Sequence, residues 1–118
     1  MRTRVLIIDD DARFRALARA LLEAKGYAVV GEAADGEQAL DAARRLRPDA
    51  ALLDVQLPDT DGFALARRLA DAHHALRILL TSSDPTLGAR APRLDGRAVA
   101  FVPKDELAIT NLAPWLGG

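Results

Sequence analysis

Apolar residues follow two alternating patterns along the chain. Short continuous apolar runs, which are typical of strands buried on both faces, occupy 5–8, 28–30, 50–53, 77–80 and 98–102. Between the first four runs, apolar residues recur at helical spacing over 14–22, 39–46 and 63–69. Gly26 is placed to end the first of these helices, and Asp35 to cap the second. Strict alternation of strand and helix predicts a parallel sheet, because parallel neighbours need a crossover connection.

The last third of the chain departs from this regular alternation. Gly88 and Pro92 interrupt any helix between 85 and 95, so we expect the fourth helix to be short or broken. A fifth helix is expected over 105–113, where Pro114 ends it. Together these elements predict one domain, residues 1–118, with an α/β fold: a doubly wound, five-stranded parallel sheet covered by helices on both faces.

Composition narrows the class of protein. Half of the 118 residues are apolar, which is enough for one compact core. The absence of cysteine excludes a disulfide framework, a thiolate metal site and a thiol nucleophile. A formal net charge of −1 gives no basic field that would attract nucleic acid or an anionic membrane. The N-terminus lacks the pattern of a signal peptide, and no apolar run approaches membrane-spanning length, so we expect a cytoplasmic protein.

The residues with the most reactive side chains follow the predicted strands. Asp9 and Asp10 come after the first strand, Asp54 after the third, Thr81 after the fourth and Lys104 after the fifth. In an open parallel sheet, ligands bind in the crevice outside the carboxyl ends of the strands. Lys104 is one of only two lysines in the chain, which makes its place at this edge informative.

Three carboxylates in one crevice would repel each other unless a cation joined them. Oxygen ligands favour a hard cation, so the sequence predicts Mg²⁺ or Mn²⁺ at Asp9, Asp10 and Asp54. A carboxylate beside such an ion, with a hydroxyl and a lysine ammonium nearby, can attack a phosphoryl group and form an acyl phosphate. Lysine supplies a compact positive charge for the phosphoryl oxygens.

These residues resemble the pattern of the response-regulator receiver domains of two-component signalling. That family has an acidic pair after strand one, a phosphoaccepting aspartate after strand three, threonine or serine after strand four, an aromatic residue late in strand five and a lysine just beyond. Here the corresponding residues are Asp9, Asp10, Asp54, Thr81, Phe101 and Lys104. Residues 53–62 also resemble the family's loop after the phosphorylation site. The resemblance covers essentially the whole chain and implies a flavodoxin-like sheet with strand order 2-1-3-4-5.

The resemblance implies a role for each residue around the metal. Asp54 would accept the phosphoryl group. Asp10 and Asp54 would bind the metal directly, together with the backbone carbonyl of Gln56, and Asp9 would bind it through water. The metal site and the phosphorylation site would therefore share one carboxylate.

The same resemblance implies how phosphorylation would change the conformation. Lys104 would pair with the acidic cluster before phosphorylation and with the phosphoryl group afterwards. Thr81 would then move to donate a hydrogen bond to a phosphoryl oxygen, and the vacated space would let Phe101 rotate inward. Charge in the crevice would thus be coupled to packing on a distant face.

The family also implies partners. The phosphoryl group would come from a histidine kinase, a phosphotransfer protein or a small phosphodonor, and the signal would pass to an output domain outside this chain or to a partner protein. Residues 29–33 and 104–107 look most like receivers that precede a helix-turn-helix DNA-binding domain, which implies control of transcription. A homodimer formed on phosphorylation is a further implied partner. The family usually follows its lysine with proline, whereas Asp105 follows Lys104 here, and the helices that form its usual partner face are irregular.

Two other functions compete with a receiver. The first is a haloacid-dehalogenase-like phosphatase with Asp9 as nucleophile and Asp11 as acid and base, which would make the protein an enzyme. Against it, Arg13 replaces the usual threonine or valine, the chain offers no cap domain, and Asp11 is equally suited to cap the first helix. The second is a receiver-like interaction module that works without phosphorylation. The complete acidic set argues against it, and we expect a phosphoacceptor domain that catalyses only its own phosphotransfer and dephosphorylation.

Overall fold

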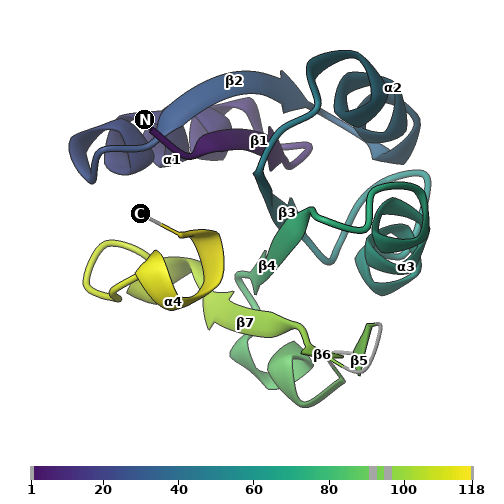
Figure 1. Cartoon of the computed structure of the whole chain (residues 1–118). Helices are drawn as coiled ribbons and strands as arrows, with labels where there is room; N and C mark the ends of the chain where they lie inside the picture. The colour runs from purple at the N-terminus through teal and green to yellow at the C-terminus, as the bar shows by residue number, and fades with distance from the viewer. Residues whose placement is uncertain (1, 91–92, 95–96, 118) are drawn as a thin grey trace.

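The structure, a computed structural model, describes residues 2–90, 93–94 and 97–117 and has an α/β architecture (Figure 1). Five strands form one sheet in the order β2-β1-β3-β4-β7, and every pairing in it is parallel. The strands are β1 (Arg4–Ile8), β2 (Ala28–Ala33), β3 (Ala50–Asp54), β4 (Arg77–Ser82) and β7 (Ala100–Pro103). The predicted parallel sheet and its strand order are therefore confirmed.

Three α-helices follow the first three strands: α1 (Ala12–Ala24), α2 (Gly36–Leu46) and α3 (Gly62–Ala72). Each begins after an aspartate, Asp11, Asp35 or Asp61, whose carboxylate accepts a backbone N–H of the first turn. Gly26, with a φ of 95°, follows α1 in the left-handed conformation that ends a helix at low cost. Within the described residues, no helix has the length and apolar character needed to cross a membrane.

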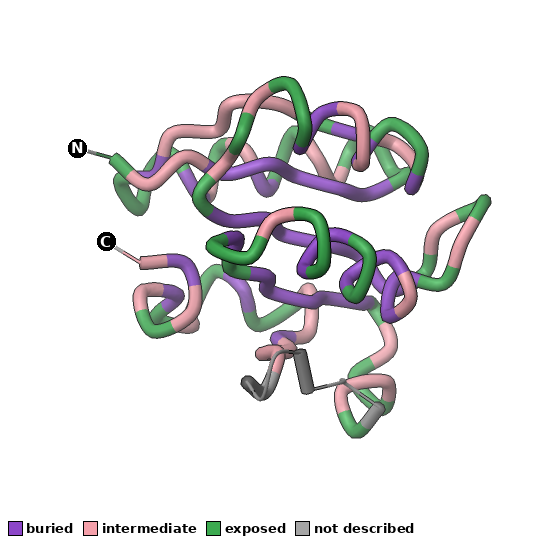
Figure 2. The backbone as a smooth tube through the Cα atoms, turned by 45° about the vertical axis from the view of Figure 1, so that its right-hand side comes forward, coloured by how far each residue is buried: buried purple, intermediate pink, exposed green. Residues whose placement is uncertain are grey.

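Both faces of the sheet are covered, as the alternating pattern predicted. On one face pack α2, α3 and the 3₁₀ helix η1 (Pro85–Arg90), and on the other pack α1 and residues 107–116. Successive residues of a strand point to opposite faces of the sheet. Leu53 therefore lies in the core on the α2 and α3 face, and Leu52 in the core on the α1 face. Figure 2 shows the central strands as a buried layer between helices that carry the exposed residues. Leu17 fits the helical spacing of α1 but is 66% exposed and lies outside the core.

The fourth helix is short, as the sequence predicted. It is the 3₁₀ helix η1, and it is followed by an antiparallel hairpin of β5 (Arg93–Leu94) and β6 (Arg97–Ala98). Positions 91–92 and 95–96 of this predicted helical region lie outside the described residues. The last strand of the sheet begins at Ala100 rather than at Ala98, because Ala98 pairs with Arg93 in the hairpin.

The predicted helix over 105–113 is wrong. The chain instead forms the 3₁₀ turn η2 (Lys104–Glu106), an irregular stretch and the short helix α4 (Ala113–Leu116). Leu107 and Leu112 are both buried in the core on the α1 face of the sheet, although the chain between them is irregular rather than α-helical. Pro114 lies in the first turn of α4, where its missing N–H has no intrahelical partner to lose, and it therefore begins a helix instead of ending one.

Candidate functional site

The structure brings three aspartates together at the carboxyl edge of the sheet. Asp9 and Asp10 follow β1, and Asp54 is the last residue of β3, the strand that pairs with β1. One carboxylate oxygen from each lies within 4.8 Å of the others. Asp9 and Asp54 are buried, whereas Asp10 is exposed. The cluster is thus buried on its protein side and exposed to solvent at Asp10.

Lys104 reaches the same cluster from the end of β7. Its Nζ lies 2.7 Å from Asp9 Oδ2, 3.0 Å from Asp54 Oδ2 and 4.1 Å from the centre of the Phe14 ring. Burial alone would lower the pKa of the Lys104 ammonium, but the two carboxylates outweigh burial and the pKa is raised. The lysine therefore remains charged, held by two anions and the face of an aromatic ring.

Asp9 is held on several sides. Its Oδ1 accepts the backbone N–H of Asp11 at 2.8 Å, and Arg15 Nη1 donates to its carbonyl oxygen at 2.7 Å. Burial raises the pKa of the Asp9 carboxyl, the Lys104 ammonium and the Asp11 N–H oppose this, and the neighbouring Asp54 charge adds to it. Asp9 Oδ2 is buried and is paired with the Lys104 ammonium at 2.7 Å.

Asp54 and Thr81 are register partners on β3 and β4. Asp54 Oδ1 accepts the backbone N–H of Gln56 at 2.9 Å, so the loop after β3 fixes this carboxylate. Thr81 is fully buried, and its Oγ1 donates to the carbonyl oxygen of Val102 at 2.7 Å. The threonine hydroxyl is therefore bonded to β7, at the residue that follows Phe101.

Phe101 lies at the boundary between the sheet and η1. The residue is partly buried and packs against the core on the α2 and α3 face. A Cβ atom at Gly88 would lie 2.6 Å from Phe101 Cδ1, so the backbone of η1 rests directly on the ring. The aromatic residue thus connects β7 to the irregular helix.

Sequence patterns did not single out three residues that contact the site. Phe14 was assigned only to the apolar side of α1, yet its ring meets Lys104. Arg15 supports the Asp9 backbone, and Ser82 donates to the side chain of Gln56 at 3.0 Å. The available signal was position: Phe14 and Arg15 lie in the first helical turn after the acidic pair, and Ser82 follows Thr81 at the strand end.

The donor set fits a hard divalent cation. Each aspartate offers a carboxylate oxygen, the ligand type that Mg²⁺ and Mn²⁺ prefer. One lysine ammonium balances only part of the charge of three carboxylates. The cluster is therefore able to bind such an ion.

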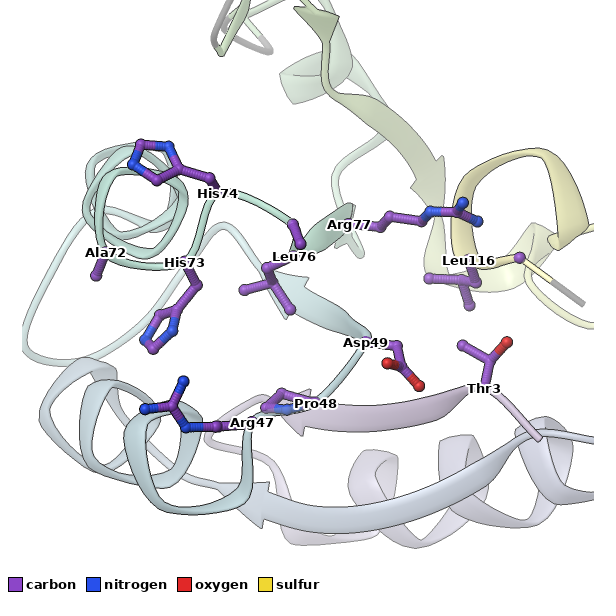
Figure 3. Close-up of a pocket in the computed structure, with 12 residues that line it drawn as sticks. Thr3, Arg47, Pro48, Asp49, Ala72, His73, His74, Leu76, Arg77 and Leu116 are labelled. Atoms are coloured by element: carbon purple, nitrogen blue, oxygen red, sulfur yellow. The ribbon is translucent and has the colours of Figure 1, made fainter. Parts of the chain in front are cut away.

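A cavity of about 710 Å³ lies at the opposite edge of the sheet (Figure 3). Asp49 and Arg77, which line it, lie at the amino-terminal ends of β3 and β4. Figure 3 shows the side chains of Arg47 and His73 directed toward one another on one side of this space. The acidic cluster lies at the carboxyl ends of β1 and β3, so the cavity is not part of the candidate site.

Known proteins with similar sequences place the chain among signalling proteins. The model of the response regulator receiver domain matches residues 5–112. The transcriptional regulatory protein PdtaR of Mycobacterium tuberculosis is 37% identical over 112 residues, which are 94% of this chain and 53% of that protein. A protein-glutamate methylesterase/protein-glutamine glutaminase of Alkalilimnicola ehrlichii is 38% identical over 107 residues, which are 88% of this chain and 27% of that protein.

A solved structure agrees with these similarities. The two-component response regulator of the LuxR family from Aurantimonas sp. SI85-9A1 superposes with a TM-score of 0.75 at 31% identity, covering 88% of this chain and 75% of that chain. The chain spans 27% and 53% of the length of the two curated relatives, so most of the first and about half of the second lie outside the similarity.

Proposed function

The chain belongs to the response regulator receiver family, and from that premise we propose that it accepts a phosphoryl group on Asp54 and changes conformation in response. The observation that carries the proposal is one ammonium, that of Lys104, placed 2.7 Å from Asp9 and 3.0 Å from Asp54. A fixed positive charge beside a buried carboxylate is suited to receive the oxygens of a phosphoryl group. The receiver family is a signalling family rather than an enzyme family, although the methylesterase relative also carries a region similar to this chain.

Asp54 is the proposed nucleophile. An oxygen of its carboxylate attacks the phosphorus of a phosphohistidine or a small phosphodonor. The bond from phosphorus to the donor atom breaks, its electron pair stays on the donor, and an acyl phosphate forms. The N–H of Gln56 holds Oδ1 of Asp54, which limits rotation of the carboxylate and keeps it aligned. Lys104, whose raised pKa keeps it charged, then pairs with the phosphoryl oxygens.

Asp10, Asp54 and the backbone carbonyl of Gln56 are the proposed direct ligands of Mg²⁺ or Mn²⁺, with Asp9 acting through water. When bound, the cation supplies positive charge to the transferring phosphoryl group. The contribution of the chain is to hold the carboxylates in place. The Asp11 N–H and the Arg15 guanidinium do this for Asp9.

Thr81 and Phe101 are the proposed switch. For Thr81 to bind a phosphoryl oxygen, its hydroxyl must leave the carbonyl of Val102, to which it now donates at 2.7 Å. The loss of that bond frees the backbone next to Phe101, whose ring supports η1 at Gly88. Phosphorylation would thus alter the packing between β7 and η1.

The proposed phosphoryl donor is a histidine kinase or a phosphotransfer protein. The proposed downstream targets of the signal are an output domain or a partner protein. A second phosphorylated copy of this chain is one such partner. Similarity to a transcriptional regulatory protein supports transcription as the regulated process. We further propose that residues 1–118 act as one domain, to which any output domain is additional.

Mass spectrometry after incubation with acetyl phosphate and Mg²⁺ tests the proposal. The expected result is one phosphoryl adduct, lost with EDTA and lost in Asp54→Asn. The matched control is Asp71→Asn, which removes an exposed carboxylate on α3. This variant should be phosphorylated normally. An adduct that survives in Asp54→Asn would overturn the assignment. Turnover of a phosphomonoester that is lost in Asp9→Asn but kept in Asp54→Asn would favour a phosphatase instead.

A further inference from the structure

The cavity of about 710 Å³ at the amino-terminal edge of the sheet is lined by cationic side chains that have no partner in the described part of the chain. They are Arg47 at the end of α2, His73 at the end of α3 and Arg77, the first residue of β4. The volume lies in the range of cavities that bind small molecules. The cavity therefore offers N–H donors to a ligand that brings its own acceptors.

Arg47 presents its side chain at the cavity from a backbone conformation that arginine seldom adopts. Its φ of 47° and ψ of 61° lie in the left-handed region, and among the described residues no other residue except glycine has a positive φ. Glycine or asparagine occupies such a position after a helix at lower cost. The chain thus keeps an arginine where a glycine would be less strained, and strain of this kind points to a function of the side chain.

The groups near Arg47 that would repel an anion are already bonded to Arg4. The last carbonyl oxygens of a helix carry partial negative charge. Arg4 Nη1 donates to the carbonyl oxygen of Arg47 at 2.7 Å, and Arg4 Nη2 donates to that of Leu46 at 2.8 Å. Asp49 also lines the cavity, and its Oδ2 accepts the backbone N–H of Arg4 at 2.8 Å. The end of α2 is therefore able to receive an anion at the Arg47 guanidinium.

Figure 3 shows that the two sides of the cavity differ in chemistry. On one side the side chains of Arg47 and His73 point toward one another, and on the other side lie Thr3, Asp49 and Arg77. A guanidinium and an imidazole can donate to the same anion, and the guanidinium fork matches the oxygens of a phosphate group. On the second side the charges of Asp49 and Arg77 offset one another and the Thr3 hydroxyl both donates and accepts, which suits neutral hydroxyl groups.

We propose that this cavity binds a small phosphomonoester that carries hydroxyl groups, of the sugar-phosphate class. The phosphate group lies between Arg47 and His73, and the hydroxyl groups face the side that carries Arg77. Asp54 is at the opposite edge of the sheet, so this binding needs neither Mg²⁺ nor phosphorylation of the chain. The proposal thus goes beyond the receiver function and does not depend on it.

An NMR titration of the full chain with ribose 5-phosphate, in EDTA at pH 7, tests the proposal. We expect saturable shifts of the backbone amides of Arg47, His73 and Arg77, and the same affinity in Asp54→Asn. Ribose, which lacks the phosphate group, should give no saturable shift at the same concentrations. Inorganic phosphate, which lacks the sugar hydroxyl groups, should bind roughly threefold or more weakly, the effect that one neutral hydrogen bond can supply.

Arg47→Gly separates binding from folding. The change removes the guanidinium but suits the left-handed backbone, so the midpoint of urea unfolding should be no lower than that of the wild type. The dissociation constant for ribose 5-phosphate should rise roughly tenfold or more, as expected for the loss of a charge-assisted hydrogen bond. The matched control is Arg68→Gln, which removes an exposed guanidinium of α3 that does not line the cavity. Its dissociation constant should stay within about twofold of the wild type.

Four results would overturn the proposal. The first is the absence of a saturable shift with ribose 5-phosphate, and the second is a set of shifts centred on Lys104 instead of the cavity. The third is an unchanged dissociation constant in Arg47→Gly. The fourth is equal affinity for inorganic phosphate and ribose 5-phosphate, which would contradict a role for the hydroxyl groups. Because the titration contains no Mg²⁺ and includes Asp54→Asn, none of these results depends on whether Asp54 accepts a phosphoryl group.

Discussion

Residues 2–82 and 83–117 meet at one site but are built differently. In the first region the strands β1, β2 and β3 are each followed by a helix that begins at an aspartate cap, and the strands β1, β3 and β4 are almost fully buried. In the second region the connecting elements are a 3₁₀ helix, a two-stranded hairpin and an irregular stretch. The first region supplies all three carboxylates and Thr81, and the second supplies Lys104 and Phe101.

The difference between the two regions indicates which part of the site is held rigidly and which part can move. Carboxylates that must hold one geometry lie at the ends of central strands, where packing on both faces fixes the backbone. Of the two groups proposed to respond, Thr81 lies at the end of β4, whereas Phe101 lies on β7 next to η1, where fewer regular hydrogen bonds oppose a change. The same site therefore combines a fixed half and a movable half.

The largest expected difference in the free energy of unfolding is between alanine substitutions of two glycines, one in each region. A Cβ at Gly62 would lie 2.3 Å from Val55 Cα and 2.6 Å from the Asp54 carbonyl oxygen, both backbone atoms of the rigid region. Gly62→Ala should therefore reduce the free energy of unfolding by about 3 kcal/mol. At Gly88 the nearest atoms belong to the Phe101 ring, which can shift, so Gly88→Ala should lose only about 1 kcal/mol. Urea unfolding measures both, and equal losses would contradict the comparison.

Within the rigid region, Asp9 is expected to reduce stability when no metal is present. Burial raises its pKa above the ordinary value, so the charged form destabilises the fold at neutral pH, and this cost disappears as the pH falls through the folded-state pKa. Asp9→Asn should raise the free energy of unfolding in EDTA by about 1–2 kcal/mol. The exposed Asp10→Asn is the control and should change it by less than about 0.5 kcal/mol. A loss of stability in Asp9→Asn would show that the ion pair with Lys104 stabilises the fold by more than burial of the Asp9 charge destabilises it.

The smallest expected effect concerns the surface ion pairs between α1 and β2. Although burial opposes it, hydrogen bonds from Arg19 and Arg15 lower the pKa of Glu32. Their contribution is fully present above the ordinary glutamate pKa and is lost as the pH falls through the lowered one. Because the groups are partly solvated, Glu32→Gln should lose less than about 1 kcal/mol at pH 7. The wild type and the variant should converge as the pH falls below the lowered pKa of Glu32, and a gap that persists in acid would rule out the ionic origin.

Sequence patterns could predict the first region because its buried residues recur at the regular spacings of strands and helices. Leu52 and Leu53 alternate between two cores, and the aspartate caps precede α1 to α3. The meeting of Asp9, Asp54 and Lys104 followed from strand ends in a parallel sheet.

The second region follows no such period. Leu107 and Leu112 are buried by a segment that is not helical, and the apolar Ile109 between them is 83% exposed. The bond from Ser82 to Gln56 joins residues 26 apart. It was beyond prediction because it depends on how closely the loop after β3 approaches the end of β4.

The central claim is that the fixed half of the site is phosphorylated and the movable half responds. Its most direct test is an NMR titration of the protein with beryllofluoride and Mg²⁺, which imitates a phosphoryl group on a carboxylate. We predict saturable shifts of the backbone amides of Gln56, Thr81 and Phe101 and of residues 84 and 86–88, with α2 unchanged and no response in Asp54→Asn. Shifts confined to the loop after β3, with Phe101 and η1 unaffected, or an undiminished response in Asp54→Asn, would contradict the account.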